Sequence, residues 1–149
     1  MPAVPQLSKA LRITAWILQI AIAGVFVLTG FSKLSGAPEA IHIFETLGME
    51  PLGRYATGLA EVVAAVLLLV PKTSAIGALL SLLVITGAIG SHVTKLGIQV
   101  TMPDGTSDGG TMFGMAVAVF LASIVVLFIR RAQLPLIGRG ATTEAPHAA

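Results

Sequence analysis

Cysteine is absent from the 149 residues, and its absence excludes disulfide bonds, dithiol redox relays and thiolate metal sites. Charged residues are also scarce, at 11% of the chain against about 25% in an average soluble domain. Hydrophobic residues instead make up 55% of the sequence, and the mean hydropathy is +0.92. Such a chain cannot cover itself with polar side chains, so we expect an integral membrane protein without a separate soluble domain.

Acidic residues are fewer than basic ones, seven against nine, which gives a formal net charge of +2. The lysines and arginines stand beside the apolar runs rather than in one basic stripe. This placement favours an orienting role in a membrane over nucleic-acid binding. The partner that we expect from composition is therefore the lipid bilayer, with no nucleic acid.

Four apolar runs are long enough to cross a bilayer as helices of about 20 residues each. They lie at about residues 13–32, 51–70, 74–92 and 111–129. We therefore predict an all-α fold, a four-helix transmembrane bundle in which residues 1–130 form a single domain. Residues 131–149 are expected to be a cytoplasmic tail, disordered beyond about Arg139 because Ala, Thr and Pro dominate there.

The two longer connections have distinct patterns. Between the first two runs, Ile41, Phe44 and Leu47 recur at helical spacing, which predicts a short amphipathic helix lying in the membrane interface. Between the last two runs, MPDG at residues 102–105 is a turn signal and predicts a small hairpin-like loop. Both connections fall on the same side of the membrane.

Four spans place both termini on one side, and the cations are unequally divided between the two sides. The side of the termini carries six of them: Lys9, Arg12, Lys72, Arg130, Arg131 and Arg139. The other side carries three: Lys33, Arg54 and Lys95. The positive-inside rule therefore predicts that both termini are cytoplasmic.

One carboxylate, Glu61, lies inside the second apolar run. An acid near the centre of a membrane helix costs about 2.5 kcal/mol or more, so the chain must neutralise it, pair it or use it. The predicted topology puts Lys33, Arg54 and His92 in the same outer half of the bundle as Glu61. A cation within about 4–6 Å would keep the carboxylate charged.

Small and polar residues share one stripe on each of the first three spans, so these stripes can meet inside the bundle. The stripes are Gln19, Ala23, Phe26, Gly30 and Lys33; Arg54, Gly58, Glu61, Ala65 and Leu68; and Gly77, Ser81, Ile85, Ala88 and His92. On the fourth span, Gly114, Ala118 and Ala122 repeat every four residues, which predicts a packing face of small residues.

An acid, a histidine and two cations around an apolar cavity suit a proton-coupled reaction on a lipophilic molecule such as a quinone. The candidate catalytic residues are Glu61 and His92, since histidine exchanges protons near neutral pH. The candidate substrate-binding residues are Lys33, Arg54, Glu61 and His92. We predict no metal site.

Each of these residues also has a structural interpretation that the sequence leaves open. In one alternative, Glu61 is buried and paired with a cation, and the pair has no role beyond locking the helices together. Lys33 can simply extend its ammonium group to the interface. His92 can be a hydrogen-bonded structural residue rather than a proton exchanger.

The sequence is similar to the DoxX-like family of small four-helix bacterial membrane proteins over about residues 10–130. The residues that carry the similarity are Arg12, LTGFSKL at 28–34, Phe44 to Met49, GLAE at 58–61 and Ala88 to His92. The resemblance implies the bacterial cytoplasmic (inner) membrane, and Lys33, Glu61 and His92 as the polar residues that correspond to those of the family. The family is named for a small membrane subunit associated with a thiosulfate:quinone oxidoreductase, and other members are linked to oxidative-stress or redox partners.

The leading hypothesis is therefore a small subunit or partner of a membrane redox system that binds a quinone or another lipophilic molecule. Because cysteine is absent, redox chemistry would lie in a bound cofactor, a quinone or an oxidoreductase partner subunit. Two alternatives stay open. One is an oligomeric transporter or permeation protein, a homo-oligomer assembled through the small residues of the fourth span. The other is a structural membrane scaffold without chemistry.

Overall fold

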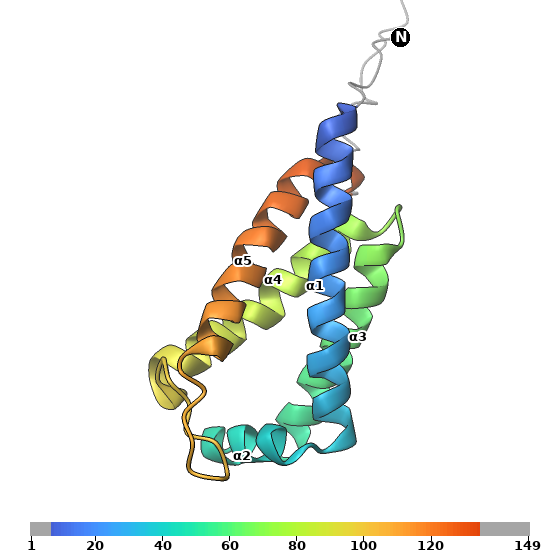
Figure 1. Ribbon diagram of the computed structural model, residues 1–149. Coiled ribbons are helices and arrows are strands. Elements are labelled where there is room, and N and C mark those ends of the chain that lie inside the picture. Colours follow the sequence, from blue (N-terminus) through green and yellow to red (C-terminus); the bar gives the residue numbers. More distant parts are fainter. Residues whose placement is uncertain (1–6, 135–149) are drawn as a thin grey trace, which may run out of the picture.

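The computed structural model describes residues 7–134, which form a bundle of helices (Figure 1). Four helices are long and apolar enough to cross a membrane: α1 (Lys9–Ser35), α3 (Leu52–Leu69), α4 (Ser74–Ser91) and α5 (Thr111–Arg130). A π-helix, η1 (His92–Leu96), continues α4, and a 3-10 turn, η2 (Arg131–Gln133), follows α5. The all-α prediction is confirmed, and the predicted disordered tail lies outside the described residues.

The short helix α2 (Pro38–Leu47) lies across one end of the bundle (Figure 1). Of its predicted apolar stripe, Phe44 is buried and Ile41 and Leu47 are half-buried, while Ala40 is buried as well. Gly48 ends the helix in the left-handed conformation at φ 73°. We refer to this end, where α1 finishes and α3 begins, as the α2 end. The opposite end, where α1 begins and α5 finishes, is the terminal end.

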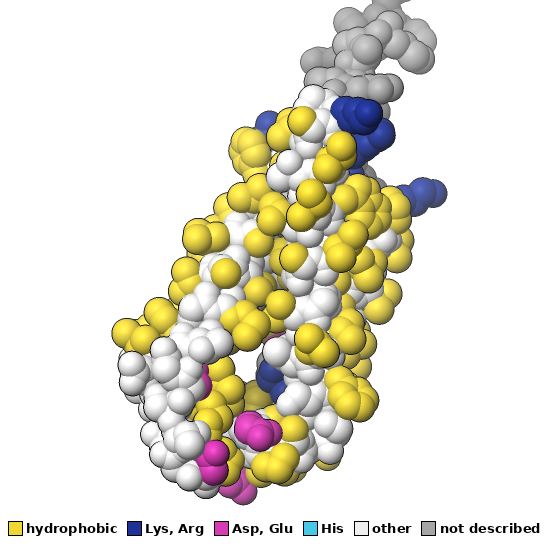
Figure 2. All heavy atoms as spheres, viewed as in Figure 1, with side chains coloured by type: hydrophobic (Ala, Val, Ile, Leu, Met, Phe, Trp, Pro, Cys, Tyr) yellow, Lys and Arg dark blue, Asp and Glu magenta, His cyan; other side chains and the backbone are white. Residues whose placement is uncertain are grey.

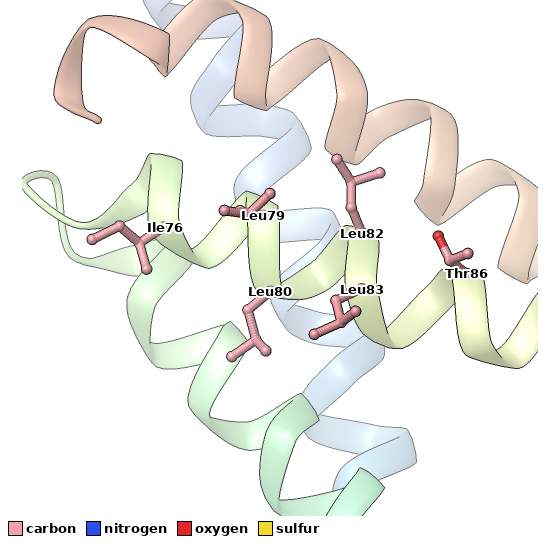
Figure 3. A pocket seen from close by; sticks show the side chains of 6 residues that line it. All are labelled: Ile76, Leu79, Leu80, Leu82, Leu83 and Thr86. Carbon is pink, nitrogen blue, oxygen red and sulfur yellow. The ribbon is translucent and has the colours of Figure 1, made fainter. Parts of the chain in front are cut away.

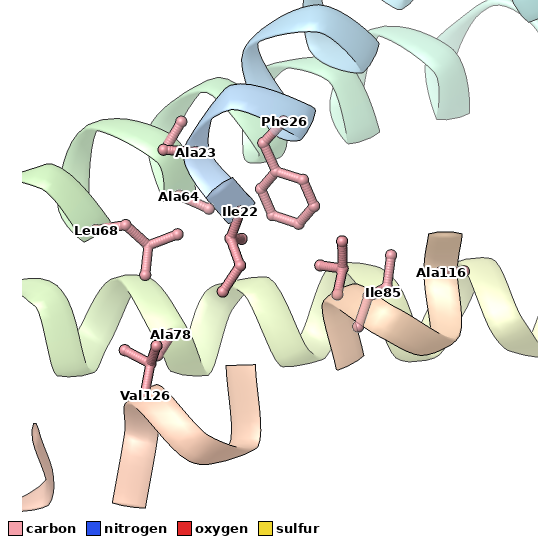
Figure 4. Close-up of a cluster of buried hydrophobic side chains, with 11 residues drawn as sticks. Ile22, Ala23, Phe26, Ala64, Leu68, Ala78, Ile85, Ala116 and Val126 are labelled. Carbon is pink, nitrogen blue, oxygen red and sulfur yellow. The ribbon is translucent and has the colours of Figure 1, made fainter. Parts of the chain in front are cut away.

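The core lies where the four long helices pack against one another (Figure 4). It joins apolar side chains such as Ile22 and Phe26 of α1, Leu68 of α3, Ile85 of α4 and Val126 of α5. Of the stripes predicted on the first three spans, every member is buried except Lys33 and Ala88, which are half-buried. The polar members of these stripes therefore do face inward.

The small-residue stripe of α5 packs within the chain only in part, through Ala122, contrary to the expectation of a compact four-helix packing face. Gly114 and Ala118 are exposed, and the buried face of α5 instead carries Ser123 and Arg130 among apolar residues. The reason lies in hydrogen bonding: Ser123 Oγ lies 2.7 Å from Ser81 Oγ of α4. In a helix that is apolar all round, such buried polar contacts fix which side turns inward.

A close helix crossing joins α3 and α4 through Gly77. A methyl group added at Gly77 would lie 2.5 Å from the backbone nitrogen of Leu68 and 2.8 Å from the backbone carbon of Leu67. Nearby, Thr73 Oγ1 donates a hydrogen bond to the carbonyl oxygen of Leu67 at 3.0 Å. The two helices therefore meet backbone to backbone directly after the turn that joins them.

The loop between η1 and α5 forms the predicted hairpin-like turn, with a β-bridge between Thr101 and Ser107. Its anchor is Asp108. The carboxylate accepts hydrogen bonds from the backbone nitrogens of Val100 at 2.7 Å, Gly110 at 3.0 Å and Met112 at 3.0 Å. These bonds, that from Met112 foremost, lower the pKa of Asp108 below its usual range.

We expect Asp108→Asn to destabilise this loop, because an amide offers one acceptor oxygen where the carboxylate offers two. Losing a cap of this kind typically costs about 1 kcal/mol. A lowered folded-state pKa gives stability that is present above the unfolded value of about 3.9 and is lost as pH falls through the folded value. Thermal unfolding in detergent should therefore show a stability loss below about pH 4 in the wild type that is smaller in the variant.

The control for this experiment is Glu45→Gln, which removes an exposed acid of α2 at the same end of the bundle. It should leave both the neutral-pH stability and the acid profile close to wild type. An Asp108→Asn protein as stable as this control at pH 7 would show that the carboxylate does not anchor the loop.

Candidate functional site

The candidate site is an ion pair between α1 and α3. Lys33 Nζ donates to both carboxylate oxygens of Glu61, each at 2.9 Å, and Thr29 Oγ1 donates to Oε2 at 3.0 Å. The side chain of Glu61 is only 7% exposed and that of Lys33 is 18% exposed. The acid inside the second span is therefore paired with a cation, and its pair has no net charge.

Two glycines allow the helices to come close enough for this pair. A methyl group at Gly30 would lie 3.0 Å from the carbonyl oxygen of Gly58, and one at Gly58 would lie 3.0 Å from Lys33 Cβ. Small residues at a crossing let membrane helices approach closely. Thr29 and Lys33 are four residues apart on α1, so both side chains reach the same carboxylate of α3.

Arg54 is not a partner of Glu61. Its Nε donates to both oxygens of Glu50 at 2.9 Å, four residues earlier, and its Nη1 donates to the backbone carbonyl oxygen of Lys33. The local acid is reached without any tertiary rearrangement, which explains the choice of partner. Arg54 thus fastens the last turn of α1, where the carbonyl groups carry the negative end of the helix dipole.

His92 lies at the α2 end but makes no hydrogen bond to Glu61, Lys33 or Arg54 within residues 7–134. It is 6% exposed, and its Nδ1 lies 2.8 Å from the carbonyl oxygen of Gly97. Its ring packs edge-on against Phe113, with centroids 5.6 Å apart. It opens the π-helix η1, a rare element that occurs frequently at functional sites.

Helices α1 and α5 diverge towards the α2 end (Figure 1), and Figure 2 shows a hollow between them above α2. A basic side chain is visible inside the hollow, and acidic side chains gather around this end of the molecule. On one side of the hollow stands α1, which carries Lys33, and on the other stands α5, which carries the Phe113 that contacts His92. The hollow therefore lies between the helix that carries Lys33 and the helix whose Phe113 contacts His92.

Two apolar grooves occur elsewhere on the bundle. One of about 500 Å³ lies on α4 (Figure 3) and is lined by Ile76, Leu79, Leu80, Leu82, Leu83 and Thr86. The other, of about 420 Å³, is lined by Ile20, Ala23, Gly24, Val27, Leu28 and Leu69. Neither includes a candidate site residue, so both suit acyl chains rather than the chemistry of the ion pair.

Two contributors to the site were missed by sequence reasoning. Thr29 donates to Glu61, and Glu50 takes Arg54 away from it. Each stands four residues before the lysine or arginine concerned. Helical spacing could have identified Thr29 on α1, whereas Glu50 lies in the turn before α3 and could have been identified only by its closeness in sequence to Arg54. Within residues 7–134, no group of three or more His, Asp or Glu side chains could hold a metal ion.

The sequence profile of the DoxX-like family matches residues 17–103 of the chain, which is more than half of its length. The matched segment contains Lys33, Arg54, Glu61 and His92, and it ends before α5 begins. No curated protein and no solved structure matches the chain.

Proposed function

The chain belongs to the DoxX-like family of membrane proteins, and we propose that it serves as a small subunit or partner of a membrane redox system. In this proposal it binds a quinone or another lipophilic molecule in the hollow at the α2 end. The observation that carries the proposal is the Lys33–Glu61 pair, held within the membrane-spanning helices with Thr29 as a third member. An ionisable residue at such a depth is by default a functional candidate.

The pair offers what a quinone requires. Reduction of a quinone to a quinol takes up two electrons and two protons, and the quinone oxygens need hydrogen-bond donors. Lys33 supplies such donors because its ammonium group has three N–H bonds, and Glu61, which Thr29 also holds, supplies a carboxylate that can take up and pass on a proton. The proposal assigns the supply of electrons to an oxidoreductase partner; the lack of cysteine excludes a dithiol relay in the chain itself.

His92 and Arg54 have supporting roles in this proposal. His92 exchanges protons between the hollow and the water at the α2 end, since Nε2 makes no hydrogen bond within the described chain. Arg54 holds the backbone of Lys33 and so positions the ammonium group. In this proposal the membrane is the bacterial inner membrane and both termini are cytoplasmic. The site then lies in the outer half of the bilayer.

Glu61→Gln tests the proposal. Glutamine is nearly isosteric with glutamate, but its amide cannot take up and release a proton and does not neutralise the charge of Lys33. We expect quinone affinity in lipid nanodiscs to fall about tenfold or more, the loss that follows from removing a charge-assisted hydrogen bond. Quinone-linked turnover of the complex isolated from membranes should fall with it. Glu45→Gln, which changes an exposed acid of α2, is the control.

Native mass spectrometry of the same complex identifies the partner and the number of copies. If the Glu61→Gln protein folds and keeps quinone affinity, turnover and its partner, Glu61 only locks the helices and the functional proposal fails.

A second candidate is an oligomeric transporter or permeation protein, which the outward face of α5 favours. Gly114 has no neighbouring atom within 4 Å of an added methyl group, and Ala118 is exposed. A face of small residues allows close association between membrane helices of separate subunits. Several copies of this chain without an oxidoreductase in the mass spectrum would favour this candidate over the redox subunit.

A further inference from the structure

Arg130, the last residue of α5, is buried at the terminal end without a counter-ion among the described residues. It is only 7% exposed, and its Nη2 donates to Gln19 Oε1 at 3.0 Å. Its Nε is buried and has no hydrogen-bond partner in the described part of the chain. Gln19 is itself fixed, because its Nε2 donates to the carbonyl oxygen of Leu68 at 2.5 Å. The guanidinium group is therefore held in place with donors to spare.

Among the described residues, the surroundings of Arg130 provide a second positive charge rather than a counter-ion. The nearby charge of Arg12 on α1 repels the guanidinium group. Trp16 lies between Arg12 and Gln19 on the same stripe of α1, and its ring centroid is 5.9 Å from Arg130 Cζ. Tryptophan is enriched where the lipid headgroups meet the hydrocarbon. A position beside Trp16 therefore suits a guanidinium group at the level of the headgroups.

Charge is strongly divided between the two ends of the molecule. Figure 2 shows the acidic side chains gathered towards the α2 end and basic side chains at the terminal end. The described acids are Glu39, Glu45, Glu50, Glu61, Asp104 and Asp108, and the seventh acid of the sequence, Glu144, lies outside residues 7–134. The described terminal end therefore has cations without an acid to pair with.

We propose that Arg130 and Arg12 bind an oxyanion of the phosphate class, supplied by the headgroup of an anionic phospholipid. A buried guanidinium group is unfavourable unless it is paired, and its planar donors match the oxygens of a phosphate. The anion also removes the repulsion between the two arginines. Phosphate bound by arginine forms short, charge-assisted hydrogen bonds, and within the described chain Gln19 takes up only the Nη2 donor of Arg130.

The lipid source fits the apolar surface next to this site. Leu11, Ile13 and Ile17 are exposed on α1 around Arg12 and Trp16. The apolar groove of about 420 Å³ begins at Ile20 and Leu69, one residue beyond the Gln19 and Leu68 that fix Arg130. A phospholipid whose phosphate sits at Arg130 can thus place an acyl chain along α1.

The test uses the full chain in nanodiscs of phosphatidylcholine with and without phosphatidylglycerol, followed by native mass spectrometry of the retained lipid. The wild type should retain phosphatidylglycerol in preference to phosphatidylcholine. Arg130→Gln and Arg12→Gln should each weaken that retention about tenfold, as expected for the loss of one charge-assisted hydrogen bond. Arg131→Gln is the control, since the exposed Arg131 stacks on Phe128 and stands outside the site.

Arg12→Gln keeps the proposal testable if Arg130→Gln fails to fold, because Arg12 is exposed and leaves the Gln19 contact intact. Equal retention of the two lipids by the wild type, or unchanged retention in Arg12→Gln, would overturn the proposal. Inorganic phosphate is added in a separate arm. If it raises the unfolding temperature of the wild type as much as phosphatidylglycerol does, the anion comes from solution and the lipid assignment is wrong.

Discussion

Lys33→Met will destabilise the bundle by about 3–5 kcal/mol, the usual cost of removing one partner from a buried ion pair. Methionine preserves the length and apolar stem of lysine, so the change mainly removes the charge. Glu61 then keeps only Thr29 as a donor, in a position that is 7% exposed. Chemical unfolding in mixed detergent micelles measures the loss.

The double variant Lys33→Met/Glu61→Gln separates the ion pair from general packing. Replacing both members of a buried pair is far less costly than stranding one of them, so the double variant should recover most of the stability lost by Lys33→Met. Lys72→Met, at an exposed lysine of the α3–α4 turn, should behave as wild type. A double variant as unstable as the single one would mean that the pair is not the source of the loss.

Gly77→Ala should reduce the free energy of unfolding by about 1–3 kcal/mol, the typical cost of overpacking a close contact. The added methyl group would meet the backbone nitrogen of Leu68 at 2.5 Å and the backbone carbon of Leu67 at 2.8 Å. Backbone atoms cannot swing aside as the end of a flexible side chain can. The α3–α4 crossing must therefore separate, and the core beside it loosens.

The same helix provides a matched control at Gly87, where an added methyl group has no atom within 4 Å. Alanine is favoured over glycine inside a helix by about 1 kcal/mol, so Gly87→Ala should be neutral or slightly stabilising. Thermal unfolding of both variants in one detergent gives the comparison. Equal unfolding temperatures would contradict the close crossing at Gly77.

Sequence periodicity predicted the inward faces of α1, α3 and α4 because each has polar residues on one stripe. Gln19, Glu61 and Ser81 are buried as those stripes require. Periodicity failed for α5, where the stripe of small residues, Gly114 and Ala118 among them, was the visible signal and the buried face is a different one. A serine in an apolar helix is a weak signal, and its orienting effect appears only when Ser81 of α4 lies opposite.

The sequence could limit which residues belong to the site, but it could not predict which of these residues pair with one another. The topology placed Lys33, Arg54 and His92 near the end of the bundle that holds Glu61. Which of them reaches the carboxylate depends on how closely α1 and α3 approach, and that distance is set by Gly30 and Gly58. Arg54 was already paired with Glu50, which lies four residues earlier in the turn before α3, and a count of cations does not reveal this competition.

Two residues of α3 hold Lys33. Arg54 donates a hydrogen bond to its backbone carbonyl oxygen, and Glu61 accepts hydrogen bonds from its ammonium group. These two contacts tie both the main chain and the side chain of one residue of α1 to α3. Unravelling of α1 from its last residue, Ser35, therefore has to break contacts with α3 once it reaches Lys33.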